Sequence, residues 1–339
     1  MALSRRAALG LLALTAFAPI VRAEPRVLVD SVGRRVNAPD KVNRVLAAGP
    51  PASILLYALA PEAMIGWVPA LPDAARPFVL PSVRELPPTE RMTSRGQTPD
   101  AEKIKALKPD LIVDFGSIGG SYVELAEKVQ ADTKVPYALI DGGLDRLPTS
   151  LRLVGDFLGR RERAEALARY AEQTLARLDA PLPKASPDRR PKVYVARGPD
   201  GLQSAVKGSA LTEVVERAGG INVAEGKPGR GGAVDVTQAQ IAAWKPDFVI
   251  ALDKGAYEAM RKPGASGSAH VLAAPTSPWN WLGEPPSINR LMGLRWLSAM
   301  FYPPKGKIDL PSEAKEFHRL FYGTTLGDAD LARLLEGAS

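Results

Sequence analysis

Residues that usually carry catalytic or metal chemistry are scarce in this chain of 339 residues. It contains two histidines, His270 and His318, and no cysteine. Without cysteine and without a His-Glu-x-x-His pair, the chain has neither a soft-ligand metal centre nor a Cys–His nucleophile. His318 falls in a predicted helix beside Phe317, so we expect it to pack or to lie at the surface. His270 precedes an apolar strand and is interpreted in the same way.

Motifs for nucleotide or serine chemistry are also missing from the sequence. There is no Gly-x-x-x-x-Gly-Lys phosphate loop, no Gly-x-Gly-x-x-Gly after a strand and no Gly-x-Ser-x-Gly turn. An exported hydrolase or lyase would need a carboxylate dyad or a nucleophile, and no such constellation can be identified. A binding protein therefore fits the sequence better than an enzyme.

The first 23 residues have the features of a signal peptide. Arg5 and Arg6 precede an apolar stretch from Ala7 to Ile20, which is too short for a stable membrane span. We expect cleavage after Ala23. Ser4 before the arginine pair partly matches a twin-arginine signal, so export by that route or by the general secretory route is open.

The absence of cysteine also limits how the mature protein can be anchored or cross-linked. No residue can accept a lipid or form a disulfide, so we expect a monomer, free in the periplasm and held by its apolar cores. The formal net charge of the whole chain is +7, and loss of three arginines with residues 1–23 lowers it to +4. No block of lysine and arginine occurs, so a nucleic-acid partner is not implied.

The chain contains an internal repeat. Residues 108–110 and 245–247 both read Lys-Pro-Asp, between the end of an amphipathic helix and an apolar strand. Upstream of each, residues 44–50 and 192–199 form a strand that runs into a Gly-Pro loop. Lys-Pro-Asp alone could be a common helix-to-strand turn. Two repeated segments in the same order instead predict two lobes of similar plan with a ligand cleft between them.

Strands alternate with helices in both halves, which predicts an α/β fold with mostly parallel sheets covered on both faces. We expect a first lobe over residues 24–148, which includes a helix from Ser53 to Leu59. Apolar positions then recur every three or four residues through 149–180, which predicts a linking helix with a join at Gly159. Residues 181–339 are predicted to form the second lobe.

This order of elements resembles the helical-backbone (class III) substrate-binding proteins of ABC importers for ferric siderophores, haem and cobalamin. Residues 106–112, Ala-Leu-Lys-Pro-Asp-Leu-Ile, are the strongest motif, and residues 286–297 resemble the C-terminal helix start of an iron-complex branch. The resemblance covers nearly the whole mature chain. It implies two Rossmann-like lobes joined by one long helix, limited hinge motion, and a ligand held by loops at the carboxyl ends of the strands. It implies no catalytic residue, no cofactor and no protein-bound metal.

The resemblance also implies ligand-binding positions, all of them in loops that follow strands or precede helices. They are Gly49, Pro50, Pro51, Trp67, Arg95, Gly96, Gly116, Ser117, Arg197, Gly198, Trp279 and Trp281.

Some of these residue types suit a chelated ligand. Arg95 and Arg197 precede glycines in loops, where a guanidinium can bind carboxylate or catecholate oxygens, although ordinary surface arginines are the alternative. Trp279 and Trp281 stand two residues apart, so an extended backbone would point both rings the same way and expose a paired aromatic surface. Trp67 ends a predicted strand and could equally pack in the core.

The family commonly docks its permease through one surface acid on each lobe. Glu102 stands at that position in the first lobe. The second lobe has Ala239 there, beside Gln238, and so departs from symmetric acid docking.

The expected cargo is an iron complex, an anionic chelate of the ferric siderophore type, delivered to an ABC permease and its ATPase at the inner membrane. Aromatic lining would favour such a chelate, whereas a small polar pocket would favour molybdate or tungstate. Haem and cobalamin are alternative complexes. Free zinc or manganese is disfavoured, because family members for those ions rely on histidine ligands.

The signal features predict that the exported protein begins at Glu24. Mass spectrometry of protein recovered from the periplasm should give the mass of residues 24–339. Recovery of an exported chain that still carries residues 1–23 would contradict the assignment.

Overall fold

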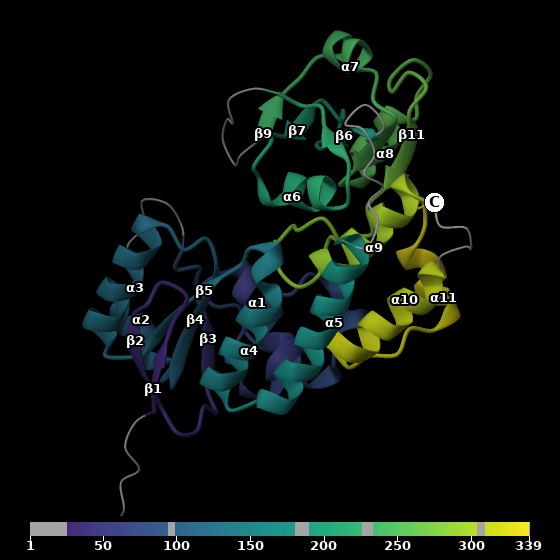
Figure 1. The fold of residues 1–339 in the computed structure, drawn as a ribbon. Helices are drawn as coiled ribbons and strands as arrows, with labels where there is room; N and C mark the ends of the chain where they lie inside the picture. The colour runs from purple at the N-terminus through teal and green to yellow at the C-terminus, as the bar shows by residue number, and fades with distance from the viewer. Residues whose placement is uncertain (1–25, 94–98, 180–189, 226–232, 304–308, 339) are drawn as a thin grey trace, which may run out of the picture.

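The computed structural model describes residues 26–93, 99–179, 190–225, 233–303 and 309–338. They form two α/β lobes, one above the other in Figure 1. The predicted signal peptide, residues 1–23, lies outside these ranges. Within them, no helix has the length and apolar character that crossing a bilayer requires.

The first lobe is built on a three-stranded parallel sheet. Its strands β3 (Val45–Ala47), β4 (Leu111–Gly116) and β5 (Tyr137–Asp141) lie side by side in that order. Helix α1 (Pro50–Leu59) follows β3, and α3 (Gly120–Thr133) follows β4. The two helices lie on opposite faces of the sheet (Figure 1).

The central strand β4 explains why both faces are covered. Leu111 and Val113 pack in one apolar cluster with Leu55 of α1, whereas Ile112 packs in another with Val129 of α3. A continuous apolar run of this kind is typical of a parallel strand between two helical layers.

The second lobe repeats this plan with four parallel strands in the order β11-β10-β6-β8. Their bounds are Lys192–Ala196 for β6, Ile221–Asn222 for β8, Phe248–Ala251 for β10 and His270–Ala273 for β11. The helices between them are α6 (Ala210–Arg217), α7 (Gln238–Trp244) and α8 (Lys254–Met260).

Two antiparallel strand pairs and a C-terminal group of helices complete the fold. The pairs are β1 (Arg26–Val29) with β2 (Arg35–Ala38), and β7 (Gln203–Ala205) with β9 (Ala233–Asp235). Helix α2 (Ala101–Ala106) precedes β4, and the C-terminal helices are α9 (Arg290–Phe301), α10 (Leu310–Phe317) and α11 (Asp328–Leu334). The strand predicted to end at Trp67 is absent, and Met64 and Trp67 form isolated bridges to Val45 and Pro88 instead.

Two helices connect the sheets. Helix α4 (Leu147–Leu158) ends at Gly159, whose φ of +68° is left-handed, and α5 (Arg161–Asp179) begins after it. The predicted join at Gly159 is confirmed, and residues 147–179 contain two helices rather than one uninterrupted helix. A left-handed residue is a common way to end a helix, and glycine adopts it without strain.

The two Lys-Pro-Asp segments have the same structure. Lys108 and Lys245 both adopt a left-handed backbone, with φ of 48° and 50°. The carboxylate of Asp110 accepts a hydrogen bond from the backbone N–H of Arg44 at 2.9 Å, and that of Asp247 accepts one from Lys192 at 2.7 Å. Each aspartate therefore ties its own strand to the start of the neighbouring strand, once in each lobe.

One apolar cluster extends through both lobes. It contains Leu55 of α1 and Leu151 of α4 together with Leu167 of α5, Val214 of α6 and Trp296 of α9. Separating the lobes would expose this apolar surface to water, which the hydrophobic effect opposes.

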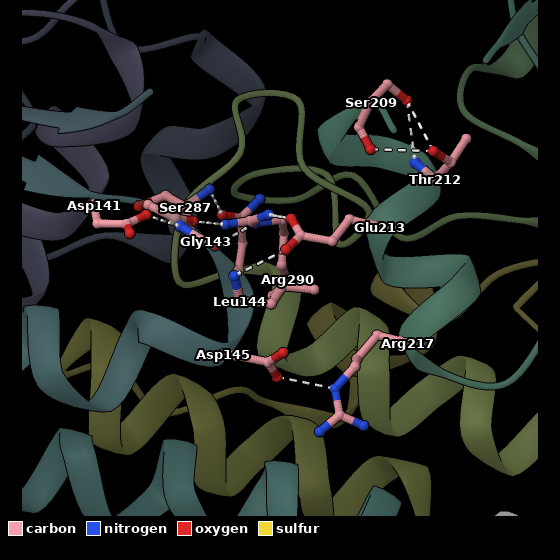
Figure 2. A network of polar contacts seen from close by, with 12 residues as sticks. Asp141, Gly143, Leu144, Asp145, Ser209, Thr212, Glu213, Arg217, Ser287 and Arg290 are labelled. Atoms are coloured by element: carbon pink, nitrogen blue, oxygen red, sulfur yellow. Dashed lines mark hydrogen bonds and ion pairs between the residues drawn. The ribbon is translucent and has the colours of Figure 1, made fainter. Parts of the chain in front are cut away.

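Polar contacts join the lobes beside helix α6 (Figure 2). The guanidinium of Arg290, at the start of α9 and 1% exposed, pairs with Glu213 of α6 at 2.7 Å and donates to the carbonyl of Gly142 in the first lobe. Glu213 also accepts from the backbone N–H of Leu144 in the first lobe, at 3.1 Å. Burial lowers the pKa of Arg290, and the carboxylate of Glu213 opposes that effect.

A buried histidine lies in an aromatic cluster near the C-terminus. His318 begins a π-helical turn, His318–Tyr322, and packs edge-on against Tyr322 and Phe78. Neither ring nitrogen has a hydrogen-bond partner among the described residues. Burial lowers the pKa of His318 to about 3. The ring is thus held neutral, and the expectation that it packs is confirmed.

Breaking the ion pair between buried Arg290 and the partly exposed Glu213 should cost stability. Glu213→Gln removes the charge that compensates Arg290 and should lower the free energy of unfolding by about 2 kcal/mol, less than for a fully buried pair because Glu213 is 40% exposed. Asp145→Asn is the matched control, because it breaks the more exposed pair of Asp145 with Arg217 of the same helix; it should cost less than about 1 kcal/mol. Equal losses in urea unfolding would contradict the role of the Arg290–Glu213 pair.

His318 should make the fold sensitive to acid. Its pKa is about 3 when folded and 6.5 when unfolded, so the unfolded state binds more protons between these values. This contribution to stability is complete above about pH 6.5 and is lost as the pH falls, by on the order of 4 kcal/mol at pH 3. His318→Leu, of similar volume, should therefore lose less stability than wild type between pH 7 and pH 4.

Asp114 has the opposite effect on the pH dependence of stability, because burial raises its pKa to about 6 and the folded state then binds more protons than the unfolded state. Wild type and His318→Leu both contain Asp114, so its contribution cancels when their free energies of unfolding are compared. Parallel stability profiles for wild type and His318→Leu, measured by chemical unfolding across pH, would refute the assignment to His318.

Candidate functional site

A cavity of about 330 Å³ lies between the lobes, beside the carboxyl ends of β3, β10 and β11. First-lobe residues on its wall are Pro50, Ser53, Ile54, residues 67–72, Ala74 and Ala75. Second-lobe residues on its wall are Leu252, residues 276–280, Glu284 and Pro285. Ligands in open α/β sheets bind at this edge of the strands, so the cavity is the candidate site.

Two tryptophans from different lobes meet at the cavity. Trp67 and Trp279 both line it, and their ring centroids are 5.8 Å apart. Tyr57 of α1 contacts both rings, at 5.5 Å and 5.8 Å. The indole N–H of Trp67 donates to the carbonyl of Val83 at 2.8 Å, which fixes its orientation. The wall therefore has an aromatic part in which the two indoles are held against each other and against Tyr57.

The predicted pairing of Trp279 with Trp281 is wrong. Trp281 is 1% exposed, does not line the cavity, and packs edge-on against Trp296 of α9 at 6.2 Å. Trp279 is 7% exposed and faces the cavity instead. The spacing rule assumes extended backbone through Asn280, but a turn follows, in which Gly283 N–H donates to the carbonyl of Asn280.

The loop after β3 places proline against the ligand space. Gly49 caps helix α1 with φ of −160°, and Pro50 and Pro51 are the first residues of the helix. Pro50 lines the cavity, whereas the carbonyl of Pro51 accepts a hydrogen bond from the hydroxyl of Ser287 at 2.9 Å. A Cβ at Gly49 would come within 2.8 Å of the hydroxyl of Thr93, so glycine allows this loop to approach its neighbour.

Buried asparagines hold the second-lobe loop that carries Trp279. The side chain of Asn280 donates to the carbonyl of Leu252 at 3.3 Å and accepts from the backbone N–H of Leu282 at 2.8 Å. Asn289 donates to the carbonyls of Asn280 and Pro285. These bonds replace strand or helix pairing, so the loop is fixed before any ligand binds.

Arg197 lies beside the cavity, not on its wall. Its guanidinium pairs with Glu284 at 2.8 Å, and Glu284 does line the cavity. Gly198 follows with a left-handed φ of +80°, and its N–H donates to the carboxylate of Asp253 at 2.8 Å. Burial raises the pKa of Glu284, and Arg197 opposes this rise.

Gly116 and Ser117 do not line the cavity. Gly116 has φ of +147°, and its carbonyl accepts from the N–H of Gly142 at 2.8 Å. A Cβ on Gly142 would lie 2.6 Å from the Cα of Gly116, so these glycines allow the ends of β4 and β5 to approach. Ser117 is exposed. Arg95 and Gly96 lie outside the described residues.

Several wall residues are not among those predicted from the sequence. Ser53 is inside α1, and its hydroxyl accepts from the backbone N–H of Val68 at 3.0 Å. Glu284 and Thr276 come from the long loop after β11. The prolines around Trp279 indicate an irregular loop, but nothing in the sequence indicates which of its side chains face the cavity.

The position predicted for permease docking is accessible. Glu102 lies in the first turn of α2, with its side chain 83% exposed and paired with Lys105. Ala239 is likewise exposed, in the first turn of α7. Both positions are therefore on the surface of their lobes.

Comparison with known proteins places this chain in a family. A sequence profile described as periplasmic binding protein matches residues 67–275. The molybdate-binding protein MolA of Haemophilus influenzae is 22% identical over 91% of this chain and 94% of its own length. Its structure with molybdate has a TM-score of 0.68, with 20% identity over 89% of this chain and 99% of the other.

Two further solved structures share the fold. An ABC transporter solute-binding protein from Sulfurospirillum deleyianum has a TM-score of 0.82, with 25% identity over 92% of this chain and 99% of the other. A periplasmic haem-binding protein from Pseudomonas aeruginosa has a TM-score of 0.55, with 24% identity over 80% and 96%. Because the family profile matches more than half of the chain, the protein belongs to the periplasmic binding protein family and is a solute-binding protein of ABC transport rather than an enzyme.

Proposed function

We propose that the protein captures a compact metal chelate, with a ferric siderophore-like complex as the favoured cargo, and delivers it to an ABC permease and its ATPase at the inner membrane. The observation that carries this proposal is the aromatic and apolar wall between the lobes, where Trp67 and Trp279 stand among prolines and alanines. A chelate encloses its metal in an organic shell, and burial of such a shell is favourable against a wall of this kind.

The size of the cavity supports a compact ligand. Its volume of about 330 Å³ is near the lower end of the range of roughly 300–1,000 Å³ for small-molecule sites. Cobalamin is the largest of the candidate complexes, and only part of it would enter this space.

A free oxyanion is the second candidate, favoured by the similarity to MolA along nearly the whole chain. Helix N-termini bind such anions through free N–H groups. At the start of α1, however, Pro50 and Pro51 have no N–H, and the N–H of Ser53 donates to the carbonyl of Gly49. Of the first four residues of this helix only Ala52 can offer a donor, which makes this helix end a poor molybdate site.

Delivery would use the exposed Glu102 on the first lobe as one contact to the permease. On the second lobe the exposed Ala239 offers no charge, so another residue of that lobe would make the second contact. Because only the first lobe would carry this acid, the charge would orient the protein on its permease.

The aromatic wall should distinguish chelates from oxyanions. Trp279→Leu removes one ring from the wall but keeps an apolar side chain, and should weaken binding of a ferric chelate about five- to tenfold, since aromatic contacts add roughly 0.5–1.5 kcal/mol beyond buried area. Molybdate affinity should change less, because molybdate has no organic face. Titration calorimetry with ferric trihydroxamates, ferric catecholates and molybdate provides the measurement.

Trp244→Leu is the matched control, because Trp244 of α7 packs on Tyr194 away from the cavity. Thermal melts would confirm that both variants are folded. Wild-type protein that binds molybdate tightly and no chelate would replace the chelate with the oxyanion as the cargo. Equal effects of both tryptophan variants on chelate binding would remove the aromatic wall from the site.

A further inference from the structure

Glu284 brings a carboxylate to a cavity that is otherwise uncharged. Of the described residues on the wall, it is the one with a charged side chain. The remaining wall consists of tryptophan, proline, aliphatic and small polar residues. The charge that a bound ligand meets therefore depends on this side chain and its neighbours.

The loop fixes the position of Glu284. Its backbone forms an antiparallel bridge with Asn280, and the N–H of Gly283 donates to the carbonyl of Asn280 at 3.1 Å. Asn280 is itself bonded to Leu252 at the end of β10. The carboxylate thus sits on a rigid support, and only its own side-chain torsions can move it.

Three loops at the carboxyl edge of the second sheet supply the charges around it. Arg197, after β6, pairs with Glu284 at 2.8 Å. Asp253, after β10, is close enough to raise the pKa of Glu284 by repulsion. These three groups, one guanidinium and two carboxylates, have a combined formal charge of −1. The wall contributed by the first lobe carries no charge among its described residues.

Arg197 is poorly placed to receive an anion. One guanidinium nitrogen, Nη2, pairs with the Glu284 carboxylate at 2.8 Å, so that carboxylate already neutralises part of the cation's charge. An anion that binds the other N–H groups of Arg197 would lie next to the carboxylate of Glu284 and be repelled by it. Glu284 is 38% exposed, so solvent weakens this repulsion without removing it.

We propose that Glu284 selects the cargo by charge: the cavity accepts metal chelates that present a cationic or hydrogen-bond-donating group to this carboxylate, and it discriminates against free oxyanions and against chelates with an anionic face. This inference rests on the proposed function and narrows it. It replaces the anionic chelate expected from the sequence with a neutral or cationic one. Arg197 is then a positioning residue, which holds the carboxylate and partly neutralises it.

Like charges placed together across an interface are costly, and specificity commonly arises from such repulsion. A donor group on the ligand, by contrast, gains a charge-assisted hydrogen bond to Glu284, which is stronger than a neutral one. Both effects are larger next to an apolar wall than in water.

The test uses one chelate in three charge states. Ferrioxamine B carries a free ammonium group, its N-acetyl derivative is neutral, and its N-succinyl derivative carries a carboxylate. Titration calorimetry with these complexes and with molybdate is carried out on wild type, Glu284→Gln and Arg197→Gln. Glu62→Gln is the matched control, because Glu62 also pairs with a partly exposed arginine, Arg160, at 2.7 Å, but lies away from the cavity.

Wild type should bind the ammonium form at least tenfold more tightly than the succinyl form. Glu284→Gln should reduce this ratio about tenfold or more and improve molybdate binding, whereas Arg197→Gln should increase the ratio. Glu62→Gln should leave it unchanged. If chelates bind but Glu284→Gln keeps the wild-type ratio, selection by Glu284 is refuted while the proposed function stands. If no chelate binds to wild type, the proposed function fails, and this inference fails with it.

Discussion

The placement of the two lobes depends on one buried cation. Arg290 begins helix α9 in the second lobe, yet its guanidinium bonds a carbonyl of the first lobe and the carboxylate of Glu213. A guanidinium removed from water is tolerated only where its hydrogen bonds and its charge are satisfied. That requirement fixes α6, α9 and the loop after β5 relative to one another. The cavity lies between the same two lobes, which this junction and the shared apolar cluster hold together.

The site itself is made of loops that behave as rigid elements. Asn280 and Asn289 satisfy backbone groups that have no partner in a strand or helix, and Ser287 bonds the carbonyl of Pro51 across the lobes. Preorganisation of this kind lowers the entropy lost on binding. A charged side chain on such a fixed loop stays close to the bound ligand. For that reason a single carboxylate can discriminate between cargoes.

The features predictable from the sequence are those encoded locally. The repeated Lys-Pro-Asp turn, the apolar β4 and the glycine between α4 and α5 each specify their own geometry, so the two-lobed α/β plan follows from them. Helix α1 begins at Pro50, earlier than the predicted Ser53, because proline is well accommodated in a first helical turn. The orientation of Trp281 and the pair of Arg197 with Glu284 depend on contacts between distant segments. Residue spacing does not predict contacts between distant segments. For these residues the sequence-based prediction of the site is therefore incomplete or wrong.

The apolar cluster that runs through both lobes limits where the chain could be divided. Each lobe has its own sheet and its own aspartate tie, so the internal repeat alone would suggest two separable halves. Yet α5 and α9 contribute to a core shared by both lobes. A lobe cut from its neighbour would expose part of that apolar core to water, which the hydrophobic effect opposes.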